Sequence, residues 1–146
     1  MRCGAEAPCV IRVNPHLEDG TPFPTTWWLT CPWLVEALGA LESAGACAEW
    51  TARIAADVDL AAAVLYADRA YRHARAVLAG GEDPSHGRGV AGQADPLTVK
   101  CLHARVAAAL AGNPDPVGRA VLARLCGAGA VFCPDPDAAT CFGADR

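Results

Sequence analysis

The sequence lacks the basic excess of a nucleic-acid-binding protein: its 146 residues carry 12 Lys and Arg against 16 Asp and Glu, a net charge of −4. A nucleic-acid interface needs a basic face, so we expect no nucleic-acid partner. The sequence has no apolar run as long as a membrane span, so no membrane contact is expected. The first residues lack the apolar segment of a secretory signal, and the expected compartment is therefore the cytoplasm.

The sequence also lacks the close cysteine pairs, C-x2-C, from which structural zinc sites usually draw their ligands. Cysteine itself is abundant, with 8 residues spread along the chain. Disulfides are disfavoured in the cytoplasm, so the expected roles are metal binding, catalysis or burial. Any shared site must therefore be assembled from isolated cysteines by the fold.

Hydrophobic residues make up 53% of the chain, which is enough to build the core of one domain. Two segments rich in β-branched and aromatic residues, 8–13 and 25–30, are predicted to pair as antiparallel strands. Capping residues and apolar periodicity predict five helices, at about residues 32–44, 46–56, 57 or 59 to 79, 96–111 and 116–125, with Asp57 or Asp59 as the cap of the third. No internal repeat or coiled-coil heptad is present. The predicted fold is α+β, a short antiparallel β-hairpin packed on four to five helices in a single domain, residues 1–126.

Two segments fall outside these elements. Residues 80–95 are rich in Gly, Asp and Pro and are predicted to form a flexible loop or lid. Residues 127–146 have turn chemistry and little periodicity, and are predicted to be an irregular C-terminal tail.

Cys31 has the strongest physical case for chemistry. It directly precedes Pro32, which suits the first position of a helix, so Cys31 is the expected N-cap. The positive end of a helix dipole favours the thiolate, the form that binds metals or attacks electrophiles. The alternative is an apolar cap residue packed beneath Trp27 or Trp28.

Cys101 and His103 are the next candidates. On a continuous helix from Pro96, residues two apart point about 200° from each other, so these two would share a metal only if the helix started late. Cys101 falls away from the predicted core stripe, where it serves as a ligand or nucleophile or packs against the hairpin. For His103 the alternative is a hydrogen-bonded histidine at the edge of the core.

Three isolated cysteines, Cys3, Cys31 and Cys101, lie at predicted loop and helix ends. Three such ligands suit a four-iron, four-sulfur (4Fe-4S) cluster with one iron open to a small-molecule substrate, in lyase or sulfur-handling chemistry. Cys9 is a candidate fourth ligand or a strand-core residue. The remaining cysteines are weaker candidates: Cys47, Cys126, Cys133 and Cys141.

Charged residues supply further candidates. Asp19 and Glu42 are candidate catalytic acids beside His103, although Asp19 also suits a turn cap before Gly20, and Glu42 also suits an ion pair with Arg53. A cofactor or anion site near the hairpin and fourth helix is predicted from three cations, with solvated charges as the alternative: Arg12, Lys100 and Arg105.

Four segments carry a likeness to a known family: D-G-T-P-F-P-T at 19–25, L-T-C-P at 29–32, L-E-S-A-G at 41–45 and V-K-C-L-H at 99–103. In order and spacing they resemble the bacterial domain-of-unknown-function family 501, best known from actinobacteria, over roughly residues 2–118. The resemblance supplies positions but no reaction: Cys3, Asp19, Gly20, Thr21, Pro22, Pro24, Thr25, Cys31, Glu42, Lys100, Cys101 and His103. The chain departs from the family pattern in residues 92–98 and at Ala108, where the family has a second histidine.

Three functions compete with the iron–sulfur prediction. One is a zinc-binding structural or interaction module built on Cys3, Cys31, Cys101 and His103. Another is an enzyme with Cys31 or Cys101 as nucleophile and His103 as base. The last is a metal-free binding partner of another protein, anchored by Trp27, Trp28 and Trp33. A homo-oligomer is a separate expectation for the chain's partners.

Overall fold

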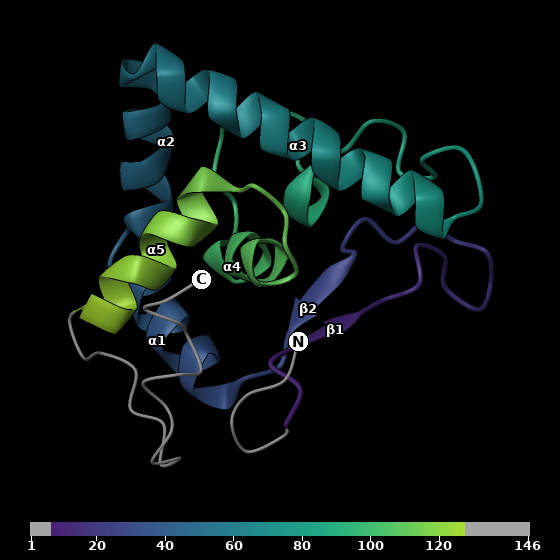
Figure 1. Ribbon diagram of the computed structural model, residues 1–146, viewed down its shortest axis with the longest axis horizontal. Helices are drawn as coiled ribbons and strands as arrows, with labels where there is room; N and C mark the ends of the chain where they lie inside the picture. The colour runs from purple at the N-terminus through teal and green to yellow at the C-terminus, as the bar shows by residue number, and fades with distance from the viewer. Residues whose placement is uncertain (1–6, 128–146) are drawn as a thin grey trace.

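The computed structural model describes residues 7–127, in which a two-stranded antiparallel sheet lies beside five α-helices (Figure 1). Strands β1 (Val10–Arg12) and β2 (Trp27–Leu29) pair with Val10 opposite Leu29. The helices are α1 (Pro32–Ser43), α2 (Ala46–Ala56), α3 (Val58–Leu78), α4 (Leu102–Leu110) and α5 (Pro116–Gly127), with a 3₁₀ turn η1 (Val90–Gly92) before α4. The predicted single-domain α+β fold is confirmed. The predicted C-terminal tail from residue 128 onward lies outside the described residues.

The first three helices begin and end close to where the capping residues predict. Pro32 starts α1 with Cys31 as its N-cap. Gly45 adopts a left-handed conformation (φ 89°), which glycine tolerates best, and so turns the chain from α1 into α2. The Asp57 carboxylate accepts hydrogen bonds from two N–H groups of the first turn of α3. Local chemistry therefore sets these boundaries.

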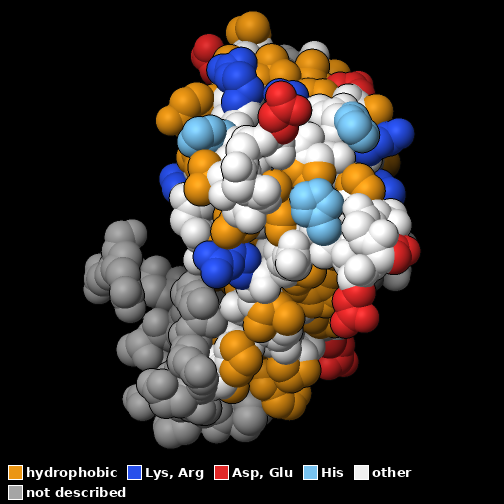
Figure 2. All heavy atoms as spheres, turned by 90° about the vertical axis from the view of Figure 1, so that its right-hand side faces the viewer, with side chains coloured by type: hydrophobic (Ala, Val, Ile, Leu, Met, Phe, Trp, Pro, Cys, Tyr) orange, Lys and Arg blue, Asp and Glu red, His pale blue; other side chains and the backbone are white. Residues whose placement is uncertain are grey.

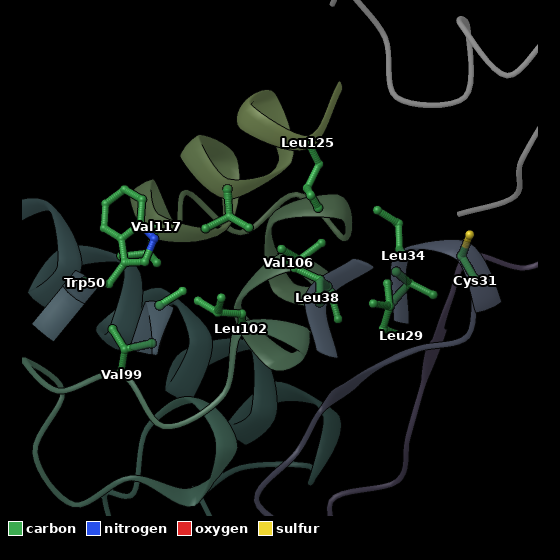
Figure 3. Packing of buried hydrophobic residues seen from close by; sticks show 14 of the residues in the cluster. Leu29, Cys31, Leu34, Leu38, Trp50, Val99, Leu102, Val106, Val117 and Leu125 are labelled. Carbon is green, nitrogen blue, oxygen red and sulfur yellow. The ribbon is translucent and has the colours of Figure 1, made fainter. Parts of the chain in front are cut away.

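Helix α4 lies at the centre of the fold and packs against α1, α5 and β2 (Figure 1). Its side chains Leu102 and Val106 are fully buried, together with Leu38 of α1 and Val117 of α5 (Figure 3). The close approach of α5 requires Gly118, because a Cβ there would lie 2.3 Å from the Arg105 carbonyl oxygen of α4. Each fully buried aliphatic side chain stabilises the fold by about 1.5–3 kcal/mol.

Two side chains of α3 hold the loops that lead to the site. The Tyr71 hydroxyl accepts a hydrogen bond from the Thr26 N–H at 2.8 Å, next to the start of β2. Arg75 is fully buried, donates to the Pro24 carbonyl at 2.7 Å and forms a two-pronged ion pair with Asp83 at 2.7 Å. The segment before β2 and the predicted loop 80–95 are thus tied to the same helix.

Replacing Asp83 with asparagine should lower the free energy of unfolding by about 2 kcal/mol at pH 7, between the values of exposed and buried ion pairs. Burial acts to raise the pKa of Asp83, but Arg75 and the Ser85 N–H outweigh it and lower that pKa overall. A carboxyl group whose pKa is lowered by folding stabilises the protein at pH values above its unfolded-state pKa of about 3.9. This contribution is lost as the pH falls through its folded-state pKa.

Denaturant unfolding of the wild type and Asp83→Asn at pH 7 and below pH 4 checks this, with the exposed neighbour Glu82→Gln as control. The difference in the free energy of unfolding between wild type and Asp83→Asn should shrink in acid. The free energy of unfolding of Glu82→Gln should stay within about 0.5 kcal/mol of the wild-type value at pH 7. An undiminished difference in acid would exclude the ion pair as its cause.

Candidate metal centre

The centre of the site is the N-terminus of α4, which begins at Leu102 and not at Pro96. The predicted start of this helix was therefore wrong. The Asp95 carboxylate accepts the Leu97 N–H at 2.9 Å, and the Gln93 amide donates to the Thr98 carbonyl at 2.7 Å. These side-chain contacts hold the preceding segment in turns, since they offer its backbone an alternative to helical hydrogen bonds.

The late start places Cys101 at the N-cap, with an extended backbone (φ −152°, ψ 120°), and His103 in the first turn. The two side chains therefore meet instead of pointing apart, and Cys101 Sγ lies 3.9 Å from His103 Nδ1. The sequence predicted that Cys101 and His103 could share a metal only if their helix started late, and α4 does start late.

Glu42, from the last turns of α1, completes a group of three. Its Oε1 lies 3.1 Å from His103 Nδ1, and the three ligand atoms of Glu42, Cys101 and His103 all lie within 4.8 Å of one another. In residues 7–127 this is the one cluster of three His, Cys, Asp or Glu side chains with the spacing of a metal site. Cys101 directly precedes α4 and His103 is its second residue, whereas Glu42 comes 61 residues before His103 in the chain.

Glu42 also anchors the start of α4, because its Oε1 accepts the Leu102 N–H at 2.5 Å. The predicted ion pair with Arg53 was wrong: the Arg53 guanidinium lies over the Trp50 ring, 4.1 Å from its centre. Burial acts to raise the pKa of Glu42, but the Leu102 N–H and His103 lower it overall. Glu42 is therefore a carboxylate at neutral pH.

The contact made by Nε2 of His103 determines which ring nitrogen faces Glu42 and Cys101. Nε2 lies 3.0 Å from the Val35 carbonyl oxygen, and a carbonyl can only accept, so Nε2 carries a proton. Nδ1 then faces the Glu42 carboxylate, which can only accept, at 3.1 Å, so either a proton on Nδ1 or a metal ion lies between the two atoms.

The thiols beside Glu42 are protonated at neutral pH. Burial raises the pKa of Cys101, the N–H groups of Ala104 and His103 act against it, and the Glu42 charge raises it further. Burial and the Glu42 charge also raise the pKa of Cys47 on α2. Neither thiol is therefore activated as a nucleophile by these surroundings.

A pocket of about 430 Å³ opens beside Cys101 and His103. It lies between β2, the start of α4, η1 and α1, and its lining is mainly apolar, with Lys100 at its edge: Thr25, Trp27, Trp28, Leu29, Val35, Ala91, Lys100, Cys101, His103 and Ala104. The predicted anion-binding residue Lys100 thus borders the same space as the predicted ligands.

Cys31 is placed differently. It is the N-cap of α1, as predicted, but its side chain is 8% exposed and packs in the core with Leu29 and Leu34 (Figure 3). It does not belong to the group of Glu42, Cys101 and His103. Cys3 lies outside the described residues, so the convergence of Cys3, Cys31 and Cys101 on one cluster stays a prediction.

The other charged candidates are not among the residues that line the pocket. Asp19 is exposed and accepts the Thr21 N–H at 2.9 Å, as a turn cap does. Arg12 is exposed on β1, opposite Trp27. Arg105 is 2% exposed and bonded to Asp115, so its predicted part in an anion site was wrong. No local pattern predicts the Arg105–Asp115 pair, because Arg105 lies in α4 and Asp115 directly precedes α5.

The hairpin exposes part of its apolar surface. Trp28 is 50% and Ile11 43% exposed, and the two residues are paired across the strands. Trp33, the second residue of α1, is 38% exposed. Figure 2 looks onto the side with the hairpin loop and the end of α3, and hydrophobic side chains gather in the lower half of this face. The predicted role of these tryptophans as anchors for a protein partner stays a prediction.

Comparison with known proteins gives one match. The model of a family described as protein of unknown function (DUF501) matches residues 1–123. No curated protein and no solved structure matches the chain. In the part of the chain that the structure describes, no helix combines the length and apolarity of a membrane span.

Proposed function

The chain belongs to the DUF501 family, and from the site geometry we propose that it binds a zinc-class divalent metal ion through Glu42, Cys101 and His103 and uses it on a small molecule. Thiolate, imidazole and carboxylate together are a donor set that zinc accepts. Soft sulfur and nitrogen donors disfavour magnesium and calcium, which prefer oxygen.

The observation that carries the proposal is the orientation of His103. Histidines that bind metals usually donate the other ring N–H to a carboxylate or a backbone carbonyl, and Nε2 of His103 faces the Val35 carbonyl in this way. Its Nδ1 faces Glu42 Oε1 at 3.1 Å and Cys101 Sγ at 3.9 Å. Ligand atoms around a tetrahedral zinc lie about 3.3–3.8 Å apart, so small side-chain shifts bring these atoms to zinc distances.

The same geometry disfavours a cysteine nucleophile. In a nucleophile–histidine–acid relay, one ring nitrogen takes the proton of the nucleophile and the other is held by the acid. Here the thiol and the carboxylate meet the same nitrogen, Nδ1, and a backbone carbonyl occupies the other. The raised pKa of Cys101 also disfavours an attacking thiolate in the metal-free protein, whereas a bound metal ion would itself deprotonate this thiol.

Three protein ligands leave one position of a tetrahedral ion for water or substrate, as in catalytic zinc sites. Cys101 and His103 border the pocket, whereas Glu42 is absent from its lining, so the open position would face the pocket. An ion so placed can polarise a carbonyl or activate water. The proposed activity is therefore Lewis-acid chemistry on a small molecule.

Elemental analysis tests the proposal. Protein purified without chelator should carry about one equivalent of zinc or a related divalent metal, and Cys101→Ser should carry far less, because it loses the thiolate ligand. Cys9→Ala, which removes a buried core cysteine outside the group of Glu42, Cys101 and His103, is the matched control and should keep the metal. Metal-free wild type that takes up no added zinc contradicts the proposal. Oxygen-free protein that is brown and holds iron and sulfide would instead favour the predicted cluster on Cys3, Cys31 and Cys101.

A further inference from the structure

Lys100 is the single lysine in the sequence, and the other 11 of its 12 basic residues are arginines. It is exposed, it directly precedes Cys101, and it borders the pocket. Of the residues that line this pocket, Lys100 carries the one permanent positive charge and none carries a carboxylate. The charge of the lining therefore favours an anionic ligand.

The rest of the lining is mainly apolar, and all three residues of β2 contribute to it. Trp27 and Leu29 are two apart on β2 and so point to the same side, toward α4, with which the strand is in contact. Trp27 is held in place by Tyr71, whose ring meets it edge-on with centres 4.9 Å apart. A preformed aromatic wall of this kind accepts a flat or aliphatic apolar group.

We infer that the pocket binds an apolar small molecule that carries one carboxylate, with the carboxylate paired to the Lys100 ammonium and the apolar part against Trp27 and Leu29. The inference rests on the proposed metal centre for the chemistry performed on this ligand, but its binding needs only the pocket and Lys100. The carboxylate then lies at the mouth of the pocket, and the remainder of the molecule reaches toward Cys101 and His103.

A matched pair of test ligands, 2-naphthoate and its neutral amide 2-naphthamide, separates charge from shape. Both are titrated into chelator-treated full-length protein, so that no metal can bind the carboxylate. The four tryptophan indole N–H signals report the location of binding by NMR. The signals of Trp27 and Trp28 should shift, whereas that of Trp50, buried in the core at α2, should not.

The naphthoate should bind about three- to fivefold more tightly than the amide, as one solvent-screened ion pair allows. Lys100→Met should abolish this preference for the naphthoate without weakening the binding of the amide. Arg119→Met, which removes an exposed cation from α5, should keep the preference. Equal affinities in the wild type, a preference that survives in Lys100→Met, or the absence of any shift at Trp27 and Trp28 would each overturn the inference. Because the measurement contains no metal, a failure of the metal proposal leaves its outcome unchanged.

Discussion

Zinc affinity should fall by about 10²- to 10³-fold when His103 is replaced by alanine. Structural zinc sites bind with about 10–16 kcal/mol from four ligands, so each ligand contributes roughly a quarter of that. His103 provides Nδ1 at the centre of the group, and its removal also deletes the contact to Val35 that orients the ring. Competition against a chromophoric zinc chelator measures the change.

The matched control is His73→Ala, which removes an exposed histidine from α3. It should leave zinc affinity unchanged within about twofold. Glu42→Gln should weaken the binding of zinc but keep the hydrogen bond at the start of α4, because an amide oxygen still accepts the Leu102 N–H. Equal affinities of His103→Ala and His73→Ala would rule out Nδ1 as a ligand.

Loss of the Asp115 carboxylate should destabilise the protein by about 3–5 kcal/mol, the cost of leaving a buried charge unpaired. Asp115 is fully buried, lies 3.2 Å from Arg105 Nη1 and accepts the Gly118 N–H at 2.9 Å. Arg105 also donates to the carbonyls of Pro96 and Thr98, just before the site. Asp115→Ala therefore removes support from α5 and from the segment that leads to Cys101.

A surface ion pair provides the contrast. Glu49 and Arg124 lie 3.9 Å apart, with side chains 52% and 57% exposed, and Glu49→Ala should cost less than about 1 kcal/mol. Urea unfolding of both variants measures the two losses. A loss for Asp115→Ala as small as that for Glu49→Ala would contradict the role given to the buried pair.

The fold could be predicted where short-range chemistry decides it. Pro32 and Gly45 mark the ends of α1, Asp57 caps α3, and the hairpin follows from its β-branched and aromatic strands. Each of these signals acts within a few residues. The position of Cys31 as an N-cap was predicted correctly for the same reason.

The start of α4 could not be predicted in this way. Pro96 is an ordinary first residue of a helix, but Arg105 binds the carbonyls of Pro96 and Thr98, and Glu42 takes the N–H of Leu102. These contacts join residues that are up to 60 positions apart. The sequence therefore named Glu42, Cys101 and His103 separately, and only the fold reveals that they meet at one point.

X-ray absorption at the zinc edge tests the proposed centre most directly. We predict one sulfur neighbour at about 2.3 Å and the remaining neighbours, nitrogen and oxygen, at about 2.0–2.1 Å. In Cys101→Ser the sulfur contribution should disappear. A coordination sphere made of several sulfurs, or a sulfur neighbour that persists in Cys101→Ser, would contradict a metal centre built on Glu42, Cys101 and His103.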